Sequence, residues 1–270
     1  MKVYDCIIYL DEDFLLDLRL NILNNFVDYF VVVESNRTWQ NNTKKFNFDI
    51  SNFKKFSDKI IYIRVEDMPN GENPWVRENF QRNCILRGLL SANDEDLIIV
   101  SDADEIPNPE KIVSFDFKRK YGVFEQEQYY YKLNLLNESY PIWRGSKACI
   151  KKYLKSPQWL RELKIKKRPF WRIDKKNLNY SIKNGGWHFC NLKTPSQLLF
   201  KYKNLCEYKD NYVFFSKIDE NFLNEKIIEE NIRNKKDIIG RDDVFKKKDI
   251  DSSYPKYILN NIKKLQDWIV

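Results

Sequence analysis

The stretch that decides the fold runs from Leu97 to Pro107 and reads Leu-Ile-Ile-Val-Ser-Asp-Ala-Asp-Glu-Ile-Pro. Its leading apolar residues predict a buried strand, and three carboxylates, those of Asp102, Asp104 and Glu105, follow at once. Carboxylates this close repel one another, and a divalent cation removes that cost. The spacing therefore indicates a metal site at the end of a strand in an open α/β sheet. The simpler interpretation is a polar loop without any ligand.

The composition is that of a folded globular protein. At 270 residues, with 43% hydrophobic and 15% aromatic residues, the chain can build one large α/β domain or two small ones. The 7 glycines and 9 prolines argue against a disordered or fibrous chain. No apolar run approaches the roughly 20 residues of a membrane span, and the N-terminal residues lack the pattern of a signal peptide. We therefore expect a cytoplasmic protein without a transmembrane segment.

Charge and cysteine content restrict the partners and the chemistry. The net charge is +8, and short basic runs suit an anionic ligand, a peripheral contact with an acidic membrane surface, or nucleic acid. No nucleic-acid-binding motif accompanies them, so we expect no nucleic-acid partner. The 5 cysteines form no Cys-x-x-Cys pair, which predicts reduced thiols and neither a zinc site nor a disulfide framework. The basic runs lie at 151–152, 164–168, 175–176 and 246–248.

Strands and helices alternate in the first half of the chain. Short apolar runs predict strands at 3–9, 29–34, 60–65 and 97–101, and apolar residues at helical spacing predict helices at 14–24 and 75–90. This alternation predicts a mainly parallel sheet with helices on both faces, which binds ligands at the carboxyl ends of its strands. The predicted strands end in polar residues, at Asp11-Glu12, Glu34-Ser35-Asn36, Glu66-Asp67 and Asp102-Ala103-Asp104.

The second half of the chain has a different pattern. Residues 123–133 predict a long aromatic strand, and tryptophans follow among charged residues, so we expect mixed strands and loops here. Helices return after Thr194, which can cap a helix, and Pro195, which suits a first helical turn. Two further helices are predicted at 220–234 and 255–262. No repeat or linker is present, which favours a single domain over residues 1–270, and no feature indicates an oligomeric state.

His188 is the only histidine of the chain and lies in Asn184-Gly185-Gly186-Trp187-His188-Phe189. The two glycines permit a tight backbone beside it. A single histidine is usually packed or at the surface. Here a candidate metal site already exists, and imidazole is a common ligand of transition metals. A structural role and a metal-binding role for His188 therefore both stay open.

Taken together, these segments resemble glycosyltransferase family 17, the β-1,4-N-acetylglucosaminyltransferases that add the bisecting residue to N-glycans. The Asp-Ala-Asp-Glu-Ile-Pro and Glu-Ser-Asn-Arg-Thr segments carry the most specific part of the resemblance, which spans almost the whole chain. Family members often have a His-x-Glu pair after the Gly-Trp-His segment, where this chain has Glu207 and Lys209. The matching segments are Glu12 with 15–19, then 27–38, 75–82, 96–107, 186–189 and 254–259.

The resemblance implies a GT-A fold, which is a Rossmann-like, mainly parallel sheet with helices on both faces, here followed by a helical C-terminal segment. It implies a UDP-sugar donor, most simply UDP-N-acetylglucosamine, a divalent cofactor (Mn²⁺ or Mg²⁺), inversion at the anomeric carbon and a glycan acceptor. It also makes residues 1–120 the nucleotide-sugar-binding half of the domain and residues 121–270 the acceptor side.

The resemblance also suggests roles for the carboxylates and His188. The expected metal ligands are Asp104 and His188, with Asp102 on the metal or near the donor ribose, because alternate residues of an extended chain point the same way. The metal would neutralise the charge that develops on the leaving diphosphate. An inverting transfer also needs a carboxylate base for the acceptor hydroxyl. Glu105 is the first candidate for this base, and Glu127 on the aromatic strand is the second.

Other side chains are candidates for contacts with donor and acceptor. Glu34, Asn36 and Thr38 are expected to hold uracil and ribose. Arg77 and Arg82 share one predicted helix, and one of them is expected to reach the diphosphate; a solvated helix face explains them equally well. Aromatic side chains more often pack in cores than bind sugars. The aromatic candidates for acceptor binding are Tyr130, Trp143 and Trp187.

Two other functions remain open at this stage. A metal-dependent nucleotidyl- or phosphoryl-transfer enzyme would also place Asp-x-Asp at a strand end, but such enzymes usually have a glycine-rich phosphate loop, which this chain lacks. A catalytically inactive sugar-binding module is the other alternative, against which the intact carboxylates and His188 argue. Metal-dependent hydrolysis of the donor separates these classes.

Overall fold

The structure is a computed structural model that describes residues 1–164, 180–206, 208 and 223–270. Trp171, the basic pair Lys175-Lys176, Glu207 and Lys209 lie outside the described residues, as does the basic run at 164–168 after its first residue.

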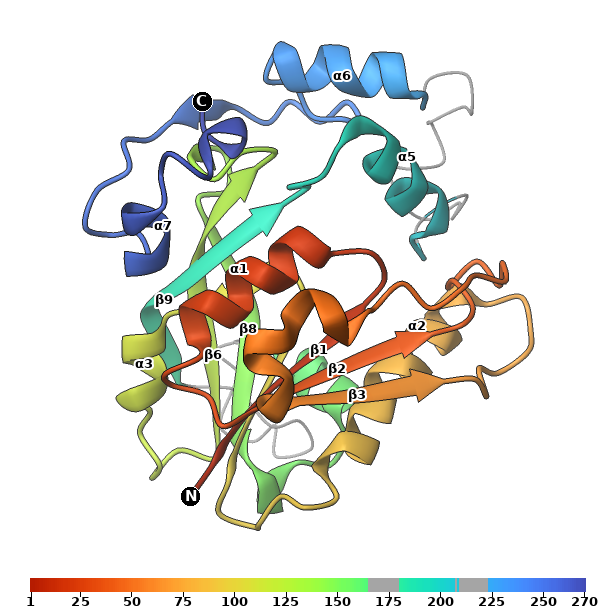
Figure 1. Cartoon of the computed structure of the whole chain (residues 1–270), viewed down its shortest axis with the longest axis vertical. Helices are drawn as coiled ribbons and strands as arrows, with labels where there is room; N and C mark the ends of the chain where they lie inside the picture. Colours follow the sequence, from red (N-terminus) through yellow and green to blue (C-terminus); the bar gives the residue numbers. More distant parts are fainter. Residues whose placement is uncertain (165–179, 207, 209–222) are drawn as a thin grey trace, which may run out of the picture.

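Four parallel strands form the first half of the sheet (Figure 1). β1 (Val3–Tyr9) lies between β2 (Tyr29–Ser35) and β4 (Leu97–Asp102), and β3 (Ile60–Val65) pairs with the other edge of β2. The order β3-β2-β1-β4 is that of one half of a Rossmann sheet. Each strand agrees with its predicted bounds to within one residue, because runs of Val and Ile buried on both faces give a strong signal for parallel strands.

The remaining strands extend this sheet beyond β4, mostly in antiparallel pairs. Their bounds are β5 Glu105–Pro107, β6 Tyr121–Tyr130, β7 Leu135–Asn137, β8 Ile142–Ile150, β9 Ser181–Cys190 and β10 Phe245–Lys247. β8 pairs with β4 and β6, and β9 lies parallel to β6 and antiparallel to β5. The predicted aromatic strand ends early, because Tyr131 has a φ of 63°. The predicted α/β fold of GT-A type, with a mixed second half, is confirmed.

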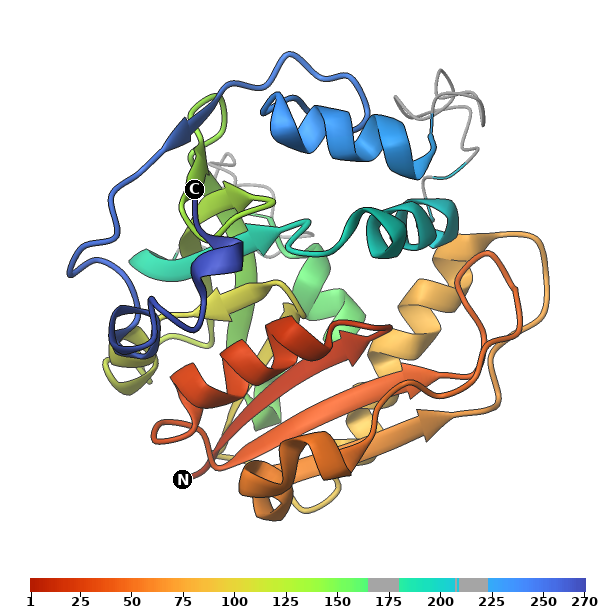
Figure 2. The same cartoon turned by 45° about the horizontal axis from the view of Figure 1, so that its top comes forward.

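Helical elements cover both faces of the parallel half (Figures 1 and 2). Alternate residues of β1 supply two separate cores, with Ile7 in the first and Cys6 and Ile8 in the second. The first core includes side chains of α1 and η1, and the second includes side chains of η2 and α4, with Phe80 of α2 packed against it. The bounds are α1 Asp13–Leu23, the 3-10 segments η1 Ile50–Lys59 and η2 Cys84–Leu89, α2 Pro74–Asn83 and α4 Pro157–Glu162.

The helix predicted at 75–90 is two elements, since α2 ends at Asn83 and a 3-10 segment follows. Gly88 in this 3-10 segment lies against β2, because a Cβ atom there would lie 2.5 Å from Cγ1 of Val31. The segment thus packs closer to β2 than any other residue would allow. In this segment the apolar side chain of Leu86 is 38% exposed.

Helices return in the C-terminal segment, as predicted. α5 (Pro195–Asn204) begins with a capping box. The Thr194 side chain accepts a hydrogen bond from the Gln197 backbone N–H, and the Gln197 side chain accepts one from the Thr194 backbone N–H. α6 (Glu225–Arg233) packs on α5 in a third core (Figure 2). The predicted start of this helix, at 220, lies outside the described residues. The other short elements are α3 Pro109–Val113, α7 Lys256–Asn260 and the 3-10 turns Lys151–Tyr153 and Gln266–Trp268.

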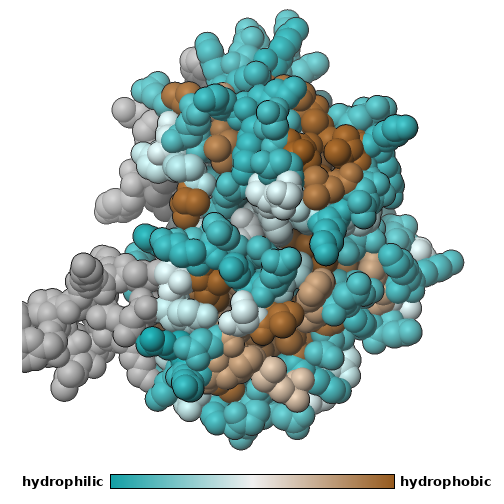
Figure 3. Space-filling model, turned by 90° about the vertical axis from the view of Figure 1, so that its left-hand side faces the viewer, coloured by the Kyte–Doolittle hydropathy of each residue, from teal (hydrophilic) through white to brown (hydrophobic). Residues whose placement is uncertain are grey.

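The face of the molecule in Figure 3 is largely hydrophilic, with small hydrophobic patches between charged side chains. Among the described helices, none combines the length and the apolar character that crossing a membrane requires.

Candidate functional site

A cleft of about 370 Å³ opens at the carboxyl ends of β1, β2 and β4, which is where α/β sheets bind ligands. Residues 8–10, 37–39 and 102–104, which follow or end these strands, line one part of it. His188 and Cys190 of β9 and the α5 residue Lys201 line another part. Segments from both halves of the chain therefore build a single cleft.

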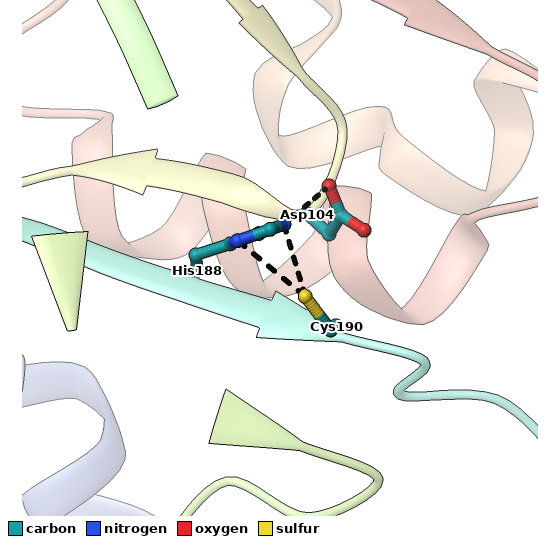
Figure 4. A group of neighbouring side chains, drawn as sticks. All are labelled: Asp104, His188 and Cys190. Atoms are coloured by element: carbon teal, nitrogen blue, oxygen red, sulfur yellow. Dashed lines mark hydrogen bonds and ion pairs between the residues drawn. The ribbon is translucent and has the colours of Figure 1, made fainter. Parts of the chain in front are cut away.

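Asp104, His188 and Cys190 converge in this cleft (Figure 4). One potential metal-ligand atom from each residue lies within 4.8 Å of the other two. Nε2 of His188 is 3.4 Å from Oδ1 of Asp104 and 3.1 Å from Sγ of Cys190. The pairing of β5 with β9 sets this geometry, because it places His188 opposite Glu105, the residue after Asp104. The two predicted ligands thus lie together, and Cys190 joins them.

Asp102 lines the same cleft but faces two arginines. Its Oδ1 is 3.2 Å from Nη2 of Arg82, and its Oδ2 is 2.8 Å from Nη2 of Arg161. Burial by itself would raise the pKa of Asp102, but the charges of Arg161 and Arg82 outweigh it, so the pKa is lowered. Asp102 is outside the group of three convergent ligands. Both carboxylate oxygens of Asp102 form ion pairs with arginines. Asp102 is therefore not positioned as a metal ligand in this structure.

Lys201 of α5 brings a positive charge to the cleft. Its Nζ is 3.5 Å from Oδ2 of Asp104 and 3.4 Å from Oδ1 of Asn191. Burial would raise the pKa of Asp104, but Lys201 and His188 hold this pKa well below its usual value. Burial would lower the pKa of Lys201, but Asp104 raises it. Both groups are therefore ionised at neutral pH, and the ammonium stands beside the candidate metal site.

Glu105, the first candidate for the catalytic base, is buried and its carboxylate is fully engaged. Oε1 accepts hydrogen bonds from Trp143 Nε1 at 2.7 Å and Arg161 Nη2 at 2.9 Å. Oε2 accepts from Arg161 Nη1 at 2.7 Å and the Asp102 backbone N–H at 3.0 Å. Glu105 is 0% exposed and does not line the cleft. Glu105 therefore orients Arg161 and the turn, and this position gives no support to the prediction that it is the catalytic base.

Glu127 and Trp187 point away from the cleft. They are register partners on β6 and β9, next to the pair Gln128 and His188, and neighbouring residues of a strand point to opposite faces. The Glu127 carboxylate lies 2.7 Å from Nζ of Lys248, and Trp187 is 5% exposed within the core shared with α1. These positions give no support to the predictions of Glu127 as the second base candidate and Trp187 as an acceptor contact.

The three polar residues predicted to bind the nucleotide have different environments. Thr38 lines the cleft. Glu34 is 0% exposed and accepts from the backbone N–H groups of Asn47 and Phe48, at 2.7 and 3.1 Å, so it holds the loop after β2. Asn36 is not a lining residue, and its buried Oδ1 has no hydrogen-bond partner among the described residues. Only Thr38 of the three is placed to touch a ligand.

The two arginines predicted to bind the diphosphate serve the protein framework. Nε of Arg77 donates to the Trp39 carbonyl oxygen at 2.5 Å, and Arg82 pairs with Glu78 at 2.5 Å and with Asp102. Neither arginine lines the cleft, so their positions give no support to the prediction that one of them reaches the diphosphate. The cations that do line it in the described part of the chain are Arg37, Lys44, Lys201 and Arg241.

Two of the predicted acceptor contacts, Tyr130 and Trp143, do line the cleft. The Trp143 ring stacks on the His188 imidazole, with centroids 5.1 Å apart and an angle of 32° between the rings. Its Nε1 also donates to Glu105. Trp143 therefore fixes the orientation of His188 and presents an aromatic surface to the cleft at the same time.

Three residues of the site were missed by the sequence analysis. Cys190 follows His188 by two positions, and this alternation places both side chains on one face of a strand. Lys201 follows the recognisable helix start at Thr194, although the motif itself does not show which face of α5 meets the cleft. Arg161 gives no local signal, because its partners Asp102 and Glu105 are distant in sequence and meet it only through the sheet.

Comparisons with known proteins identify the family of the chain. The model of the family described as glycosyltransferase family 17 matches residues 1–250. A human β-1,4-mannosyl-glycoprotein 4-β-N-acetylglucosaminyltransferase is 32% identical over 103 residues, a match that covers 34% of this chain and 19% of the human one. The rat enzyme of the same name gives the same identity and coverage. The chain therefore spans less than a fifth of the length of these curated relatives.

Solved structures show only weak overall similarity. Staphylococcus aureus TarS 1–349 is 13% identical, with a TM-score of 0.40, and the match covers 75% of this chain and 64% of that one. HddC from Yersinia pseudotuberculosis is 10% identical, with a TM-score of 0.38, covering 68% and 90%. Scores this low carry no conclusion about function.

Proposed function

Because the chain belongs to glycosyltransferase family 17, we propose that it is a metal-dependent, inverting transferase that moves N-acetylglucosamine from its UDP donor to a glycan hydroxyl. The observation that carries this proposal is the convergence of Asp104 with His188 and Lys201 in a cleft at the strand ends. Such a cleft offers a cation site and a fixed ammonium to a leaving diphosphate. The names of the partial relatives support the choice of sugar.

The residues present fit a divalent ion, which the family resemblance puts as Mn²⁺ or Mg²⁺. A carboxylate oxygen and an imidazole nitrogen face each other at 3.4 Å, with Nε2 of His188 turned to Asp104. A bound ion would supply positive charge to the diphosphate as it leaves. The stacked ring of Trp143 holds His188 in this orientation, and the β5–β9 pairing holds Asp104 beside it.

Lys201 replaces the two predicted arginines as the residue that binds the diphosphate. Its Nζ stands next to Asp104 in the cleft, so an anionic group bound there meets both the ammonium and the metal site. The uracil is expected over the ends of β1 and β2, where Leu10, Thr38 and Trp39 line the cleft. Arg82 and Arg161 act indirectly, since their charges hold Asp102 ionised and in place.

The acceptor hydroxyl must lose a proton to a carboxylate that reaches the cleft. Of the described lining carboxylates, Asp104 belongs to the metal group, and Glu12 is paired with Lys193 at 3.2 Å. Glu78 and Asp102 are paired with Arg82, at 2.5 and 3.2 Å, so each of these carboxylates has a cationic partner or belongs to the metal group. We propose that the base is one of Glu12, Glu78 and Asp102. Conversion of the base to its amide should abolish transfer but leave UDP binding unchanged, so Glu12→Gln, Glu78→Gln and Asp102→Asn, compared side by side, identify it.

The first experiment measures nucleotide release from a panel of nucleotide sugars with Mn²⁺, with Mg²⁺ and with EDTA. We expect UDP to be released from one UDP-sugar in a metal-dependent manner and the rate to fall at least about a hundredfold in Asp104→Asn. The matched control is Asp67→Asn, an exposed strand-end aspartate paired with Arg87 outside the cleft.

Two results would contradict the proposal. Equal activity of Asp104→Asn and the control would remove Asp104 from the reaction. Release of UMP with a sugar phosphate, in place of UDP, would show phosphoryl transfer, the alternative reaction class.

A further inference from the structure

We propose that Cys190 is a third protein ligand of the metal, beside Asp104 and His188, and that its sulfur makes the site prefer Zn²⁺ or Co²⁺ over Mg²⁺. The biological meaning of this preference rests on the proposed function, but metal binding itself does not. Sulfur ligation was not expected from the sequence, because it contains no Cys-x-x-Cys pair.

The distances between the donor atoms suit one shared ion. Bonds of about 2.1 Å to nitrogen or oxygen and 2.3 Å to sulfur, at angles of roughly 90–110°, separate neighbouring ligand atoms by about 3.0–3.6 Å. Nε2 of His188 lies 3.4 Å from Asp104 Oδ1 and 3.1 Å from Cys190 Sγ. Two of the three pairs therefore already have the separation of ligands on one ion. The third pair, the carboxylate oxygen of Asp104 and Sγ of Cys190, lies within 4.8 Å, so these two side chains move closer together when they share an ion; Figure 4 shows all three residues around a common centre.

The backbone builds this arrangement from two elements. His188 and Cys190 alternate on β9, so their side chains share one face of the strand. The backbone N–H of Phe189, between them, donates to the Asp104 carbonyl oxygen at 2.9 Å and ties the turn to β9. Asp104 directs Oδ1 to His188 and Oδ2 to Lys201, so an ion bound through Oδ1 leaves the lysine pair intact.

A hydrogen-bond network alone explains the cluster less well. Sγ of Cys190 lies 3.4 and 3.1 Å from the two ring nitrogens of His188, but a thiol has only one weak donor proton. Cys190 and His188 are both buried, at 8% exposure each, so water supplies few hydrogen bonds to them. A cation placed between the three atoms satisfies all of them at once.

The chemistry of the ligand set decides which ion binds. Mg²⁺ prefers six oxygen ligands in a regular octahedron, whereas imidazole and thiolate ligands suit zinc and similar ions. Cys190 binds as the thiolate, so its proton passes to solvent when the ion enters. The hard-ion site expected from Asp-x-Asp alone thus becomes a mixed oxygen, nitrogen and sulfur site.

Titration of the full-length protein with Co²⁺, without any donor, tests this directly. We expect a thiolate-to-cobalt charge-transfer band in the near ultraviolet in the wild type and in Cys206→Ser, and its loss in Cys190→Ser. Cys206 is the matched control, because it is also buried and near the cleft, with its Sγ 3.4 Å from Glu78. We also expect Cys190→Ser to bind Co²⁺ at least about tenfold more weakly.

A competition experiment keeps the proposal testable even if Cys190→Ser does not fold. In the wild type, Zn²⁺ should displace Co²⁺ at stoichiometric concentration, and Mg²⁺ should fail to do so in large excess. Cys190→Asp should retain a metal site in which Mg²⁺ competes at least tenfold better. An unchanged band in Cys190→Ser, no band in the wild type, or equal competition by Mg²⁺ would each overturn the proposal. Metal binding without donor turnover would count against the proposed function alone.

Discussion

Asp102 and Asp104 lie two positions apart in one turn, yet their carboxylates have different ion-pair partners. Asp102 faces Arg82 and Arg161, whereas Asp104 faces His188 and Lys201. Each carboxylate thus has compensating positive charge before any ligand binds, which keeps both ionised in a partly buried place. At the scale of single residues, the Asp-x-Asp motif divides into one aspartate held by the framework and one that faces the ligand.

Arg161 and Glu105 form a buried bidentate pair whose strength can be measured. Removing one partner leaves an uncompensated buried charge, so Arg161→Met should lower the free energy of unfolding by about 3–5 kcal/mol. Glu105→Gln should also lower the free energy of unfolding, and the double variant should lower it by less than the sum of the two single changes. Urea unfolding of the four proteins gives this coupling.

The control for this cycle is the exposed pair Arg87 and Asp67, at 2.7 Å, where removal of the arginine should change stability by less than about 1 kcal/mol. Purely additive costs for Arg161 and Glu105 would contradict the pairing.

Sequence signals reached the residues of the site unevenly, for physical reasons. Asp104 follows the end of an apolar strand and His188 follows a glycine pair, and these local patterns were enough to predict both residues as candidate metal ligands. The side-chain direction of Glu105, Glu127 and Trp187 depends on which face of the sheet each residue occupies, and in mixed strands buried on both faces no polar alternation reveals that face. The contacts of Arg161 and Lys201 need tertiary structure, which no local pattern encodes.

At the scale of elements, the pairing of β5 with β9 positions the candidate metal group. Gly186 permits this pairing, since its φ is +130° and a Cβ atom there would lie 2.1 Å from the carbonyl oxygen of Ile106. β5 has only three residues, and β9 is the strand with which it pairs. The long parallel strands were predictable from apolar runs, whereas short strands such as β5 and β10 are defined only by their partners.

Gly186→Ala should therefore separate β5 from β9. We expect a loss of about 3 kcal/mol or more in the free energy of unfolding, from backbone strain together with the clash. Co²⁺ binding should weaken along with it.

Gly71→Ala is the control for this substitution, because Gly71 has a similar φ of +119° but nothing within 4 Å of the added atom. It should cost only about 1–2 kcal/mol, from strain alone, and leave metal binding intact. Equal effects of the two changes would show that the clash at β5 does not matter.

Lys147 on β8 joins this strand to the end of α4 and gives a pH dependence. Its Nζ donates to the carbonyl oxygens of Arg161 and, at 2.7 Å, Leu163. Burial, followed by the charge of Arg161, lowers the pKa of Lys147 from 10.5 to about 8. Between these values the unfolded chain binds more protons than the folded one, so stability rises with pH.

Between pH 8 and 10.5, the deprotonation of Lys147 in the folded protein should raise the free energy of unfolding by about 3 kcal/mol. Lys147→Met cannot show this gain, so the stability difference between wild type and variant should shift in favour of the wild type over that range. Urea unfolding at several pH values measures the difference, and a constant difference would refute the assignment.

At the scale of the whole molecule, one mixed sheet passes through both halves of the chain. β4 of the first half pairs with β8 of the second, and the core shared with α1 also takes side chains from both halves, among them Ile99 and Phe189. The division at residue 120, which the resemblance suggested, therefore does not separate the hydrophobic cores.

This continuity predicts cooperative unfolding. Urea curves followed by far-ultraviolet circular dichroism and by tryptophan fluorescence should superimpose, with a single transition. The tryptophans report on both halves, since Trp39 and Trp75 precede residue 120 and Trp143 and Trp187 follow it. Two separated transitions would show that residues 1–270 do not form a single domain.

The late position of β9 in the chain has a consequence for synthesis on the ribosome. β5, and the side of β6 that pairs with β9, stay without a partner until residues 181–190 have emerged. Until then the nascent chain presents unpaired strand edges, which are sites of association between chains. Asp104 likewise has neither of its partners, His188 and Lys201, until those residues have been synthesised. Slower translation at low temperature, or chaperones that shield these edges, should therefore raise the yield of folded protein more than any change to the metal supply.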